Sequence, residues 1–179
     1  MLIKTVFSGF GGQGVLSMGH TLASAAMLEG KYVTYFTSYG AEVRGGTANC
    51  TVSVSDEEIA SPVASQPDFV VSMNQPSFLR FQSLVQSGGL ILVNSSMVNI
   101  TSVRGDIEVV EIPTSELAEK LGNLKVANMI ILGAFVRVSN ITSFPLLLKN
   151  LPAILGAKRS RLLKINKEAL ELGFNYLQG

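Results

Sequence analysis

The pattern of this 179-residue sequence predicts an α/β fold of three layers, in which helices cover both faces of a mostly parallel sheet. Short runs rich in Val, Ile and Phe alternate with longer runs of helical periodicity, and this order is typical of parallel strands joined by helices. A glycine-rich turn connects the first apolar run to the first helix. Because the chain has no internal repeat, low-complexity segment or linker, we expect one domain over residues 1–179.

The first half of the chain is expected to supply most of the strands. Gly30 follows the first helix, in the position where a glycine commonly ends one. The segment 47–54 alternates polar and apolar residues, which predicts a half-exposed strand that is antiparallel or at an edge. In order, we expect a strand at 2–8, a helix at 15–28, strands at 32–37, 47–54 and 69–72, a helix at 78–85 and a strand at 90–94.

The second half is expected to be mainly helical after a strand at 107–112. Thr114 is placed to cap the next helix, and Glu116 lies where a negative charge favours the helix dipole. The helix at 126–138 is apolar almost all round, so we expect it to be central in the core or covered by a partner. Two further helices are predicted at 144–155, broken by Pro152, and at 164–177.

The composition indicates a chain that works inside an assembly. Hydrophobic residues make up 47% and charged residues only 15%, whereas a typical soluble domain carries about 25% charge. A monomer of this composition would expose large apolar patches, which usually mark protein contacts. The net charge of +1, without a basic stripe, argues against nucleic acid as a partner.

Several function classes are disfavoured by what the sequence lacks. It shows neither a signal peptide nor the run of about 18 apolar residues that spans a bilayer, so we expect a cytoplasmic protein without a membrane contact. Cys50 and His20 are its only cysteine and histidine. A zinc or iron–sulfur site built from this chain alone is therefore excluded, and Cys50 is expected to be a buried structural thiol. We assign no catalytic and no metal-binding residue.

The segment from Gly9 to Gly14 reads Gly-Phe-Gly-Gly-Gln-Gly and lies between a strand and a helix. A strand that turns on glycines into a helix presents backbone N–H groups and the positive end of the helix dipole, which suit an anion. The segment matches the dinucleotide fingerprint of Rossmann-like domains, but no acidic residue that could hold a ribose appears before Glu42. Three interpretations stay open: a nucleotide site, glycines that serve packing, and a contact with another anion or a partner.

A second constellation, Tyr39-Gly40-Ala41-Glu42-Val43-Arg44-Gly45-Gly46, follows the second predicted strand. It is expected at the same carboxyl edge of the sheet as the first loop, where α/β proteins bind ligands. Arg44 offers a planar fork for a carboxylate or phosphate, and the two glycines allow close approach of another backbone. The alternative is a tight turn with an exposed ion pair between Glu42 and Arg44.

Together these residues resemble the gamma subunit of the 2-oxoacid:ferredoxin oxidoreductases, the enzymes acting on pyruvate, 2-oxoglutarate or ketoisovalerate. The family's loop commonly reads Y-G-P-E-M-R-G-G, and here Ala41 and Val43 replace the Pro and Met. The likeness covers nearly the whole chain. It continues in Leu121-Gly122-Asn123, Asn128-Met129, Leu132-Gly133, Asn166, Ala169 and Gly173.

The resemblance implies an accessory subunit of an oxidoreductase, inactive when isolated. The complex would use thiamine diphosphate, Mg²⁺, iron–sulfur clusters and coenzyme A, none of them bound by this chain alone, with alpha, beta and ferredoxin-like delta subunits as partners. We expect the chain to shape the coenzyme A and thiamine diphosphate region near the subunit interface. The residues implied are Gly9, Gly11, Gly12, Gln13, Gly14, Glu42, Arg44, Gly45, Gly46 and Asn128.

Two other functions remain compatible with the sequence. One is a free-standing nucleotide-binding enzyme of the NAD(P) type, against which the missing ribose acid counts. The other is a purely structural scaffold subunit whose glycine loops only pack. Nucleotide binding by the isolated chain would favour the first, and loop variants that alter assembly but not kinetics would favour the second.

Overall fold

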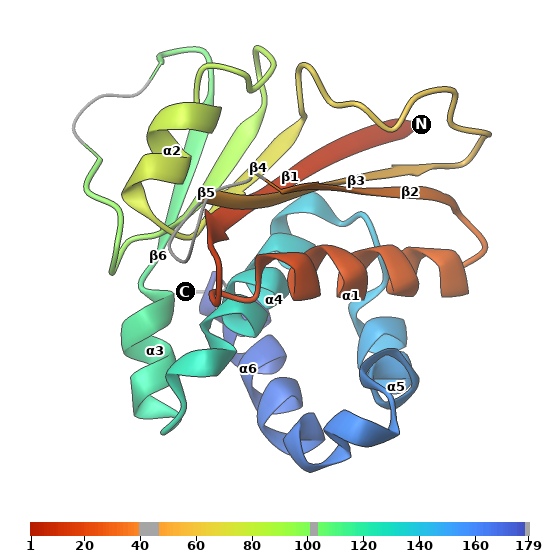
Figure 1. Cartoon of the computed structure of the whole chain (residues 1–179), viewed down its shortest axis with the longest axis vertical. Coiled ribbons are helices and arrows are strands. Elements are labelled where there is room, and N and C mark those ends of the chain that lie inside the picture. The colour runs from red at the N-terminus through yellow and green to blue at the C-terminus, as the bar shows by residue number, and fades with distance from the viewer. Residues whose placement is uncertain (40–46, 101–103, 178–179) are drawn as a thin grey trace.

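The computed structural model describes residues 1–39, 47–100 and 104–177, and it has six strands in one sheet beside a layer of helices (Figure 1). The strands are β1 (Leu2–Phe10), β2 (Tyr32–Tyr39), β3 (Thr47–Ser55), β4 (Phe69–Ser72), β5 (Leu90–Asn94) and β6 (Glu108–Ile112). The helices are α1 (Val15–Leu28), α2 (Gln75–Phe81), α3 (Thr114–Lys120), α4 (Ala127–Ser139), α5 (Phe144–Leu155) and α6 (Leu163–Tyr176), with short 3-10 helices η1 (Leu124–Val126) and η2 (Ala157–Leu162).

The sheet has the strand order β2-β3-β1-β4-β5-β6 and is mostly parallel, as predicted. β1, β4, β5 and β6 pair in parallel, and β3 pairs antiparallel with both β1 and β2. The expectation that the strand at 47–54 is antiparallel or at an edge is therefore confirmed by its antiparallel pairing, and the strand lies inside the sheet between β1 and β2. Its polar face is not half-exposed, since Ser53 is fully buried. Lys4, opposite Ser53, donates to the Val63 carbonyl and so ties the β3–β4 connection across that face.

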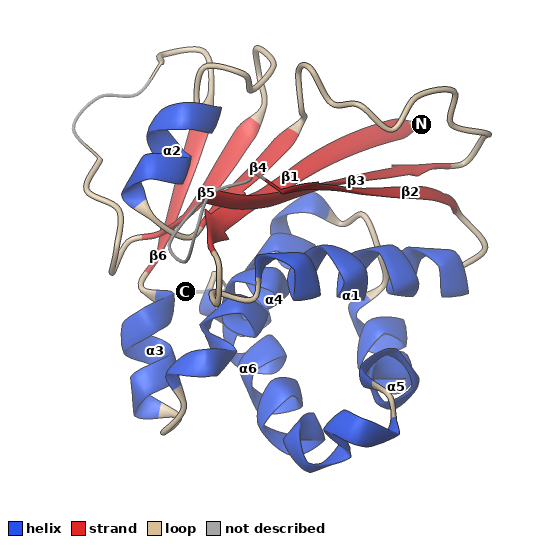
Figure 2. Ribbon diagram, in the orientation of Figure 1, coloured by secondary structure: helices blue, strands red, loops and turns tan. Residues whose placement is uncertain are grey.

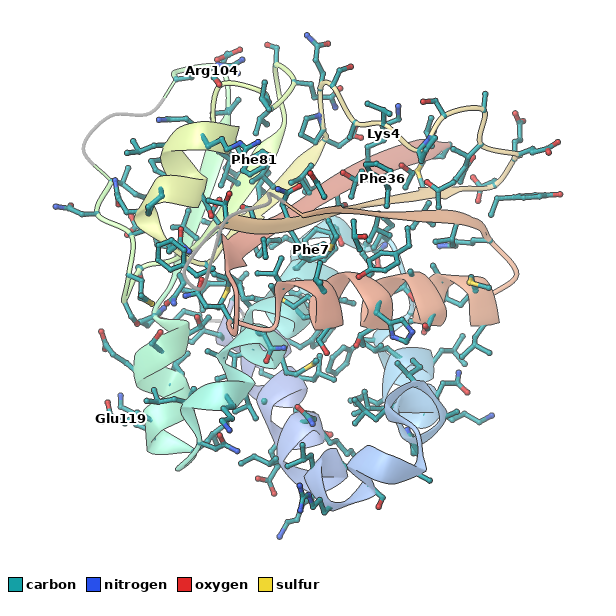
Figure 3. All side chains as sticks on the ribbon, viewed as in Figure 1. Lys4, Phe7, Phe36, Phe81, Arg104 and Glu119 are labelled. Carbon is teal, nitrogen blue, oxygen red and sulfur yellow. The ribbon has the colours of Figure 1, made fainter. Side chains whose placement is uncertain are left out.

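Helices cover both faces of the sheet, but unequally (Figure 2). Alternate residues along each strand point to opposite faces. Phe7 of β1 therefore packs with Met18 of α1 and Phe135 of α4, whereas its neighbour Val6 packs with Phe81 of α2. Figure 3 shows Phe7 on the side of the larger helical layer and Phe81 on the opposite side. The predicted three-layer arrangement is confirmed, with α2 the one described helix on its face.

α4 is the central helix of the larger layer, as its all-apolar sequence predicts, and its residues 127–136 are all buried. It crosses α6 at very short range. A Cβ added at Gly133 would lie 2.1 Å from the Leu170 carbonyl oxygen, and one added at Gly173 would lie 1.8 Å from the Ile130 carbonyl oxygen. Each helix therefore uses a glycine to let the backbone of the other approach.

The ends of three helices differ from expectation for local reasons. α2 begins at Gln75 rather than at residue 78, because Asn74 caps it by accepting a hydrogen bond from the Ser77 N–H. Thr114 is the first residue of α3 rather than its cap, and Pro113 holds the cap position. The predicted break at Pro152 is wrong, because α5 continues past it to Leu155. In the described part of the chain, no helix is long and apolar enough to cross a bilayer.

Candidate functional site

The Gly9–Gly14 loop connects the end of β1 to the start of α1 through a tight turn. The Gln13 N–H donates to the Phe10 carbonyl at 3.1 Å. Gly12 and Gly14 have φ angles of 95° and 73°, in the left-handed region that glycine adopts at the lowest cost. α1 then begins with Gly14 as its cap residue, so no side chain accepts hydrogen bonds from the first turn. The positive end of the α1 dipole therefore lies at this loop without a capping side chain.

The four glycines of the loop fall into two pairs. Gly9 and Gly14 are required for packing, because an added Cβ would lie 2.8 Å from Val15 Cγ2 at Gly9 and 2.3 Å from Asn128 Nδ2 at Gly14. Gly11 and Gly12 are exposed, and an added Cβ at either would meet no atom within 4 Å. Packing thus explains the first pair. The second pair leaves open space in front of the loop, where another molecule can approach the backbone.

Gln13 fixes the loop to the neighbouring strand ends. Its Oε1 accepts hydrogen bonds from the Phe10 N–H at 2.7 Å and from Asn74 Nδ2 at 2.8 Å. Its Nε2 donates to the Met73 carbonyl at 3.4 Å. Because Asn74 also caps α2, this one side chain couples the end of β1, the end of β4 and the start of α2.

Asn128 lies beneath the loop, at the start of α4. Its Nδ2 donates to the Gly14 carbonyl at 3.3 Å, and the side chain is only 6% exposed. Its Oδ1 is buried and has no hydrogen-bond partner among the described residues. A buried acceptor without a donor is costly, typically about 1–3 kcal/mol. The contact of Asn128 with Gly14 ties the loop to the core.

The carboxyl ends of the parallel strands form a crevice beside this loop. α1 leaves β1 toward one face and α2 leaves β4 toward the other, and such a switch point is where α/β sheets bind ligands. A hollow of about 290 Å³ opens there, lined by Gly12, Gln13, Met73, Met97, Ser115, Leu124, Lys125 and Ala127. A second hollow, of about 500 Å³, is lined by Gln75 and by residues 95–99.

Sequence reasoning missed most residues of this crevice. Asn74 and Asn94 each close an apolar strand run, and Asn94 Oδ1 accepts from the Ser96 and Ser115 N–H groups. An asparagine at the end of a buried apolar run was the available signal for a turn at the carboxyl edge. Lys125 had no such signal, because its place depends on how η1 folds back toward β1.

Four predicted site residues, Glu42, Arg44, Gly45 and Gly46, lie outside the described residues. The residues on either side of them are described, and these flanking residues are close to the first loop. In the sheet register Tyr39 is opposite Ala48, Ala48 is opposite Gly9 and Thr47 is opposite Phe10. Tyr39 and Thr47, the described residues on either side of 40–46, therefore lie at the same end of the sheet as Gly9 and Phe10.

Cys50 of β3 and His20 of α1 are not among the residues that line the crevice, and both lie next to Tyr35 of β2. Cys50 is fully buried with Sγ 3.7 Å from the Val15 carbonyl oxygen, and burial raises the pKa of its thiol to about 12. A thiol that stays protonated at neutral pH is a poor nucleophile, which agrees with the structural role predicted for it. The His20 ring contacts the Tyr35 ring edge-on, with centroids 6.4 Å apart.

Known proteins resemble this chain in sequence and in fold. Residues 4–176 match the family model described as "Pyruvate ferredoxin/flavodoxin oxidoreductase". Ketoisovalerate oxidoreductase subunit VorA of Methanothermobacter thermautotrophicus is 41% identical over 134 residues, which are 75% of this chain and 28% of VorA. The chain thus spans less than a third of that relative's length.

Two solved structures share the fold over nearly all of the chain. The gamma subunit of a keto/oxoacid ferredoxin oxidoreductase from Geobacter sulfurreducens is 29% identical with a TM-score of 0.82, covering 97% of this chain and 96% of that one. A 2-oxoglutarate:ferredoxin oxidoreductase from Magnetococcus marinus, with 2-oxoglutarate, coenzyme A and succinyl-CoA bound, superposes with a TM-score of 0.88 at 24% identity. It covers 99% of this chain and 31% of that one.

Proposed function

The chain belongs to the pyruvate ferredoxin/flavodoxin oxidoreductase family, and from this membership we propose that it is the gamma-type subunit of a cytoplasmic 2-oxoacid:ferredoxin oxidoreductase. The complete enzyme oxidatively decarboxylates a 2-oxoacid, forms an acyl-CoA and passes electrons to ferredoxin. The observation that carries this proposal is the likeness to a separate gamma subunit along almost the full length of both chains. Alpha, beta and ferredoxin-like delta subunits are its proposed partners.

The described residues of this chain do not fit the redox cofactors of such an enzyme. Its one cysteine is fully buried and its thiol stays protonated, so it is unsuited to hold an iron–sulfur cluster. No group of three or more His, Cys, Asp or Glu side chains gathers within residues 1–39, 47–100 and 104–177 in a way that could hold a metal ion. We assign thiamine diphosphate, Mg²⁺ and the clusters to the partner subunits, which in this proposal perform the chemistry.

Coenzyme A fits the Gly9–Gly14 loop better than the redox cofactors do. Gly11 and Gly12 leave their backbone open, at the positive end of α1, and this arrangement suits a phosphate. Gln13 and Asn128 hold the loop in shape from below, through Phe10 and Gly14. We assign Arg44 the role of charge partner, and Glu42, Gly45 and Gly46 the role of shaping its loop. In this proposal the loops face the coenzyme A and thiamine diphosphate region at the subunit interface.

Two substitutions test this role in the reconstituted complex. Gly11→Ala leaves the fold intact, because the added methyl group has open space, but it obstructs close approach to the loop. Arg44→Ala removes a charge that binds phosphate or carboxylate, worth about 1.5–3 kcal/mol. Each is expected to raise the KM for coenzyme A, or to weaken assembly, by about tenfold or more. Steady-state kinetics with coenzyme A as the varied substrate and sedimentation of the complex measure both effects.

The matched controls are Gly105→Ala, at another glycine with open space around it, and Arg161→Ala, at an exposed arginine of η2. Neither control is expected to change assembly or the KM. If Gly11→Ala and Arg44→Ala leave both quantities unchanged as well, the loops have no part in coenzyme A binding or assembly.

A purely structural role is the second candidate, because Gly9 and Gly14 are explained by packing alone. It predicts that loop variants weaken assembly while the complex that does form keeps normal kinetics. A free-standing NAD(P) enzyme is not favoured, since β2 carries no acidic residue to hold a ribose.

A further inference from the structure

The two edges of the sheet are built differently. β6 forms one edge, has five residues and carries two exposed glutamates, Glu108 and Glu111. Charged residues and short length are the usual means by which proteins keep a free edge from pairing with another strand. β2 forms the opposite edge, has eight residues with the sequence YVTYFTSY, and contains neither a charge nor a proline. The sheet therefore protects one edge and leaves the other able to pair.

β2 is also the least covered strand in the described part of the chain. None of its residues 32–38 is buried, whereas each of the other five strands contributes at least one buried hydrophobic residue to the core. Tyr32 is 53% exposed and Phe36 is 50% exposed. Figure 3 shows Phe36 on the face of the sheet away from α1. A long, uncharged, aromatic edge strand that stays free in water is an aggregation site, so a working protein covers it.

We propose that the β2 edge is an interface with a second copy of this chain, formed by antiparallel pairing of β2 with its own counterpart. A two-fold axis perpendicular to the sheet at Phe36 generates such a pair and keeps each face of the sheet continuous. Phe36 then lies opposite its own copy and Thr34 lies opposite Ser38. Aromatic pairs and hydroxyl pairs directly opposite each other stabilise antiparallel strands.

The side chains of β2 match one another in this pairing. Only the residue on the axis meets its own copy, so Phe36 faces Phe36 while the Thr34 hydroxyl faces that of Ser38. β2 has no charge along its whole length, so self-pairing leaves no charged side chain without a partner. The β6 edge, in contrast, carries two glutamates.

The flanking helix is uncharged as well, and in the turn that joins it to β2 Glu29 and Lys31 pair with each other at 3.6 Å. α1 packs beneath β2, where the Tyr35 hydroxyl donates to the Leu16 carbonyl at 3.0 Å. α1 has no charged residue, and Met27 and Leu28 are well exposed near its end. A hollow of about 290 Å³ between α1 and α5 lies beside them, lined by His20, Ser24, Met27, Leu28, Ala153 and Ile154. The apolar surface therefore continues from the β2 edge onto α1.

Sedimentation equilibrium of the purified full chain tests the proposal. The wild type is expected to have twice the 19.1 kDa mass of one chain. Phe36→Lys places two ammonium groups opposite each other and should raise the dimer dissociation constant at least about tenfold. Leu79→Lys is the matched control, because Leu79 of α2 is 53% exposed and far from this edge. A monomeric wild type, or equal dissociation by both variants, would overturn the proposal.

A cross-linking experiment locates the contact. Opposite residues in an antiparallel pair have Cα atoms about 4.5–5.5 Å apart, within the range of a disulfide. Phe36→Cys is expected to form a covalent dimer under mild oxidation, whereas Leu79→Cys stays monomeric on a non-reducing gel. The native thiol of Cys50 is fully buried and does not compete. Equal cross-linking of the two variants would place the dimer contact elsewhere and contradict the proposal.

Discussion

Replacing Gly173 with alanine is expected to lower the free energy of unfolding by more than about 3 kcal/mol, or to prevent folding. The added methyl carbon would lie 1.8 Å from the Ile130 carbonyl oxygen, an atom of a buried helix backbone that cannot move aside without displacing α4. The sign is informative, because alanine in an ordinary helix interior is about 1 kcal/mol more favourable than glycine. Gly133→Ala should behave in the same way, since its methyl carbon would meet Leu170.

Urea unfolding followed by far-ultraviolet circular dichroism measures this effect, with Gly105→Ala as the control. Gly105 is exposed and an added Cβ there would meet nothing within 4 Å, so its variant should stay within about 0.5 kcal/mol of the wild type. Wild-type stability in Gly173→Ala would mean that α4 and α6 do not approach as closely as described.

Gln13→Ala is expected to be the second most damaging change, with a loss of about 2–4 kcal/mol. It removes the acceptor shared by the Phe10 N–H and Asn74 Nδ2, and it leaves both donors without that partner. Because Asn74 also caps α2, the loss reaches the neighbouring strand end. Thermal unfolding of the isolated chain and the yield of reconstituted complex should both fall.

Two variants separate the hydrogen bonds from the loss of side-chain bulk. Gln13→Glu keeps an oxygen that can accept from both donors but loses the donation to the Met73 carbonyl, so it should recover part of the stability. Gln82→Ala changes a half-buried glutamine at the end of α2 and should have little effect. If Gln13→Ala is as stable as Gln82→Ala, Gln13 does not hold the strand ends together.

The alternation of strands and helices could be predicted from the sequence, because the spacing of apolar residues differs between a strand and a helix. The apolar run 126–138 predicted a central helix, which is α4. The loop at Gly9–Gly14 was predicted between a strand and a helix, and it connects β1 to α1. The order of the strands in the sheet could not be predicted from the sequence. The polar residues of β3 suggested an exposed face, but that face is crossed by the contact between Lys4, which is distant in sequence, and Val63 of the β3–β4 connection.

The candidate site was predictable to a similar extent. The glycines of the first loop were visible, but the division into packing and open positions depends on Val15 and Asn128, whose proximity only the folded chain creates. Gly133 and Gly173 appeared as a family pattern without a physical reason. Their reciprocal contact at the α4–α6 crossing supplies that reason, and it is a property of two helices rather than of either sequence segment.

The most direct test of the central claim is to purify the tagged chain from its native host without oxygen and to identify what accompanies it. The same preparation is assayed for coenzyme A-dependent reduction of a viologen dye with a panel of 2-oxoacids. We expect partner chains that carry thiamine diphosphate and iron–sulfur motifs, together with activity on one 2-oxoacid that disappears when coenzyme A is omitted. A chain that elutes without such partners and supports no such activity would contradict its assignment as a gamma-type subunit.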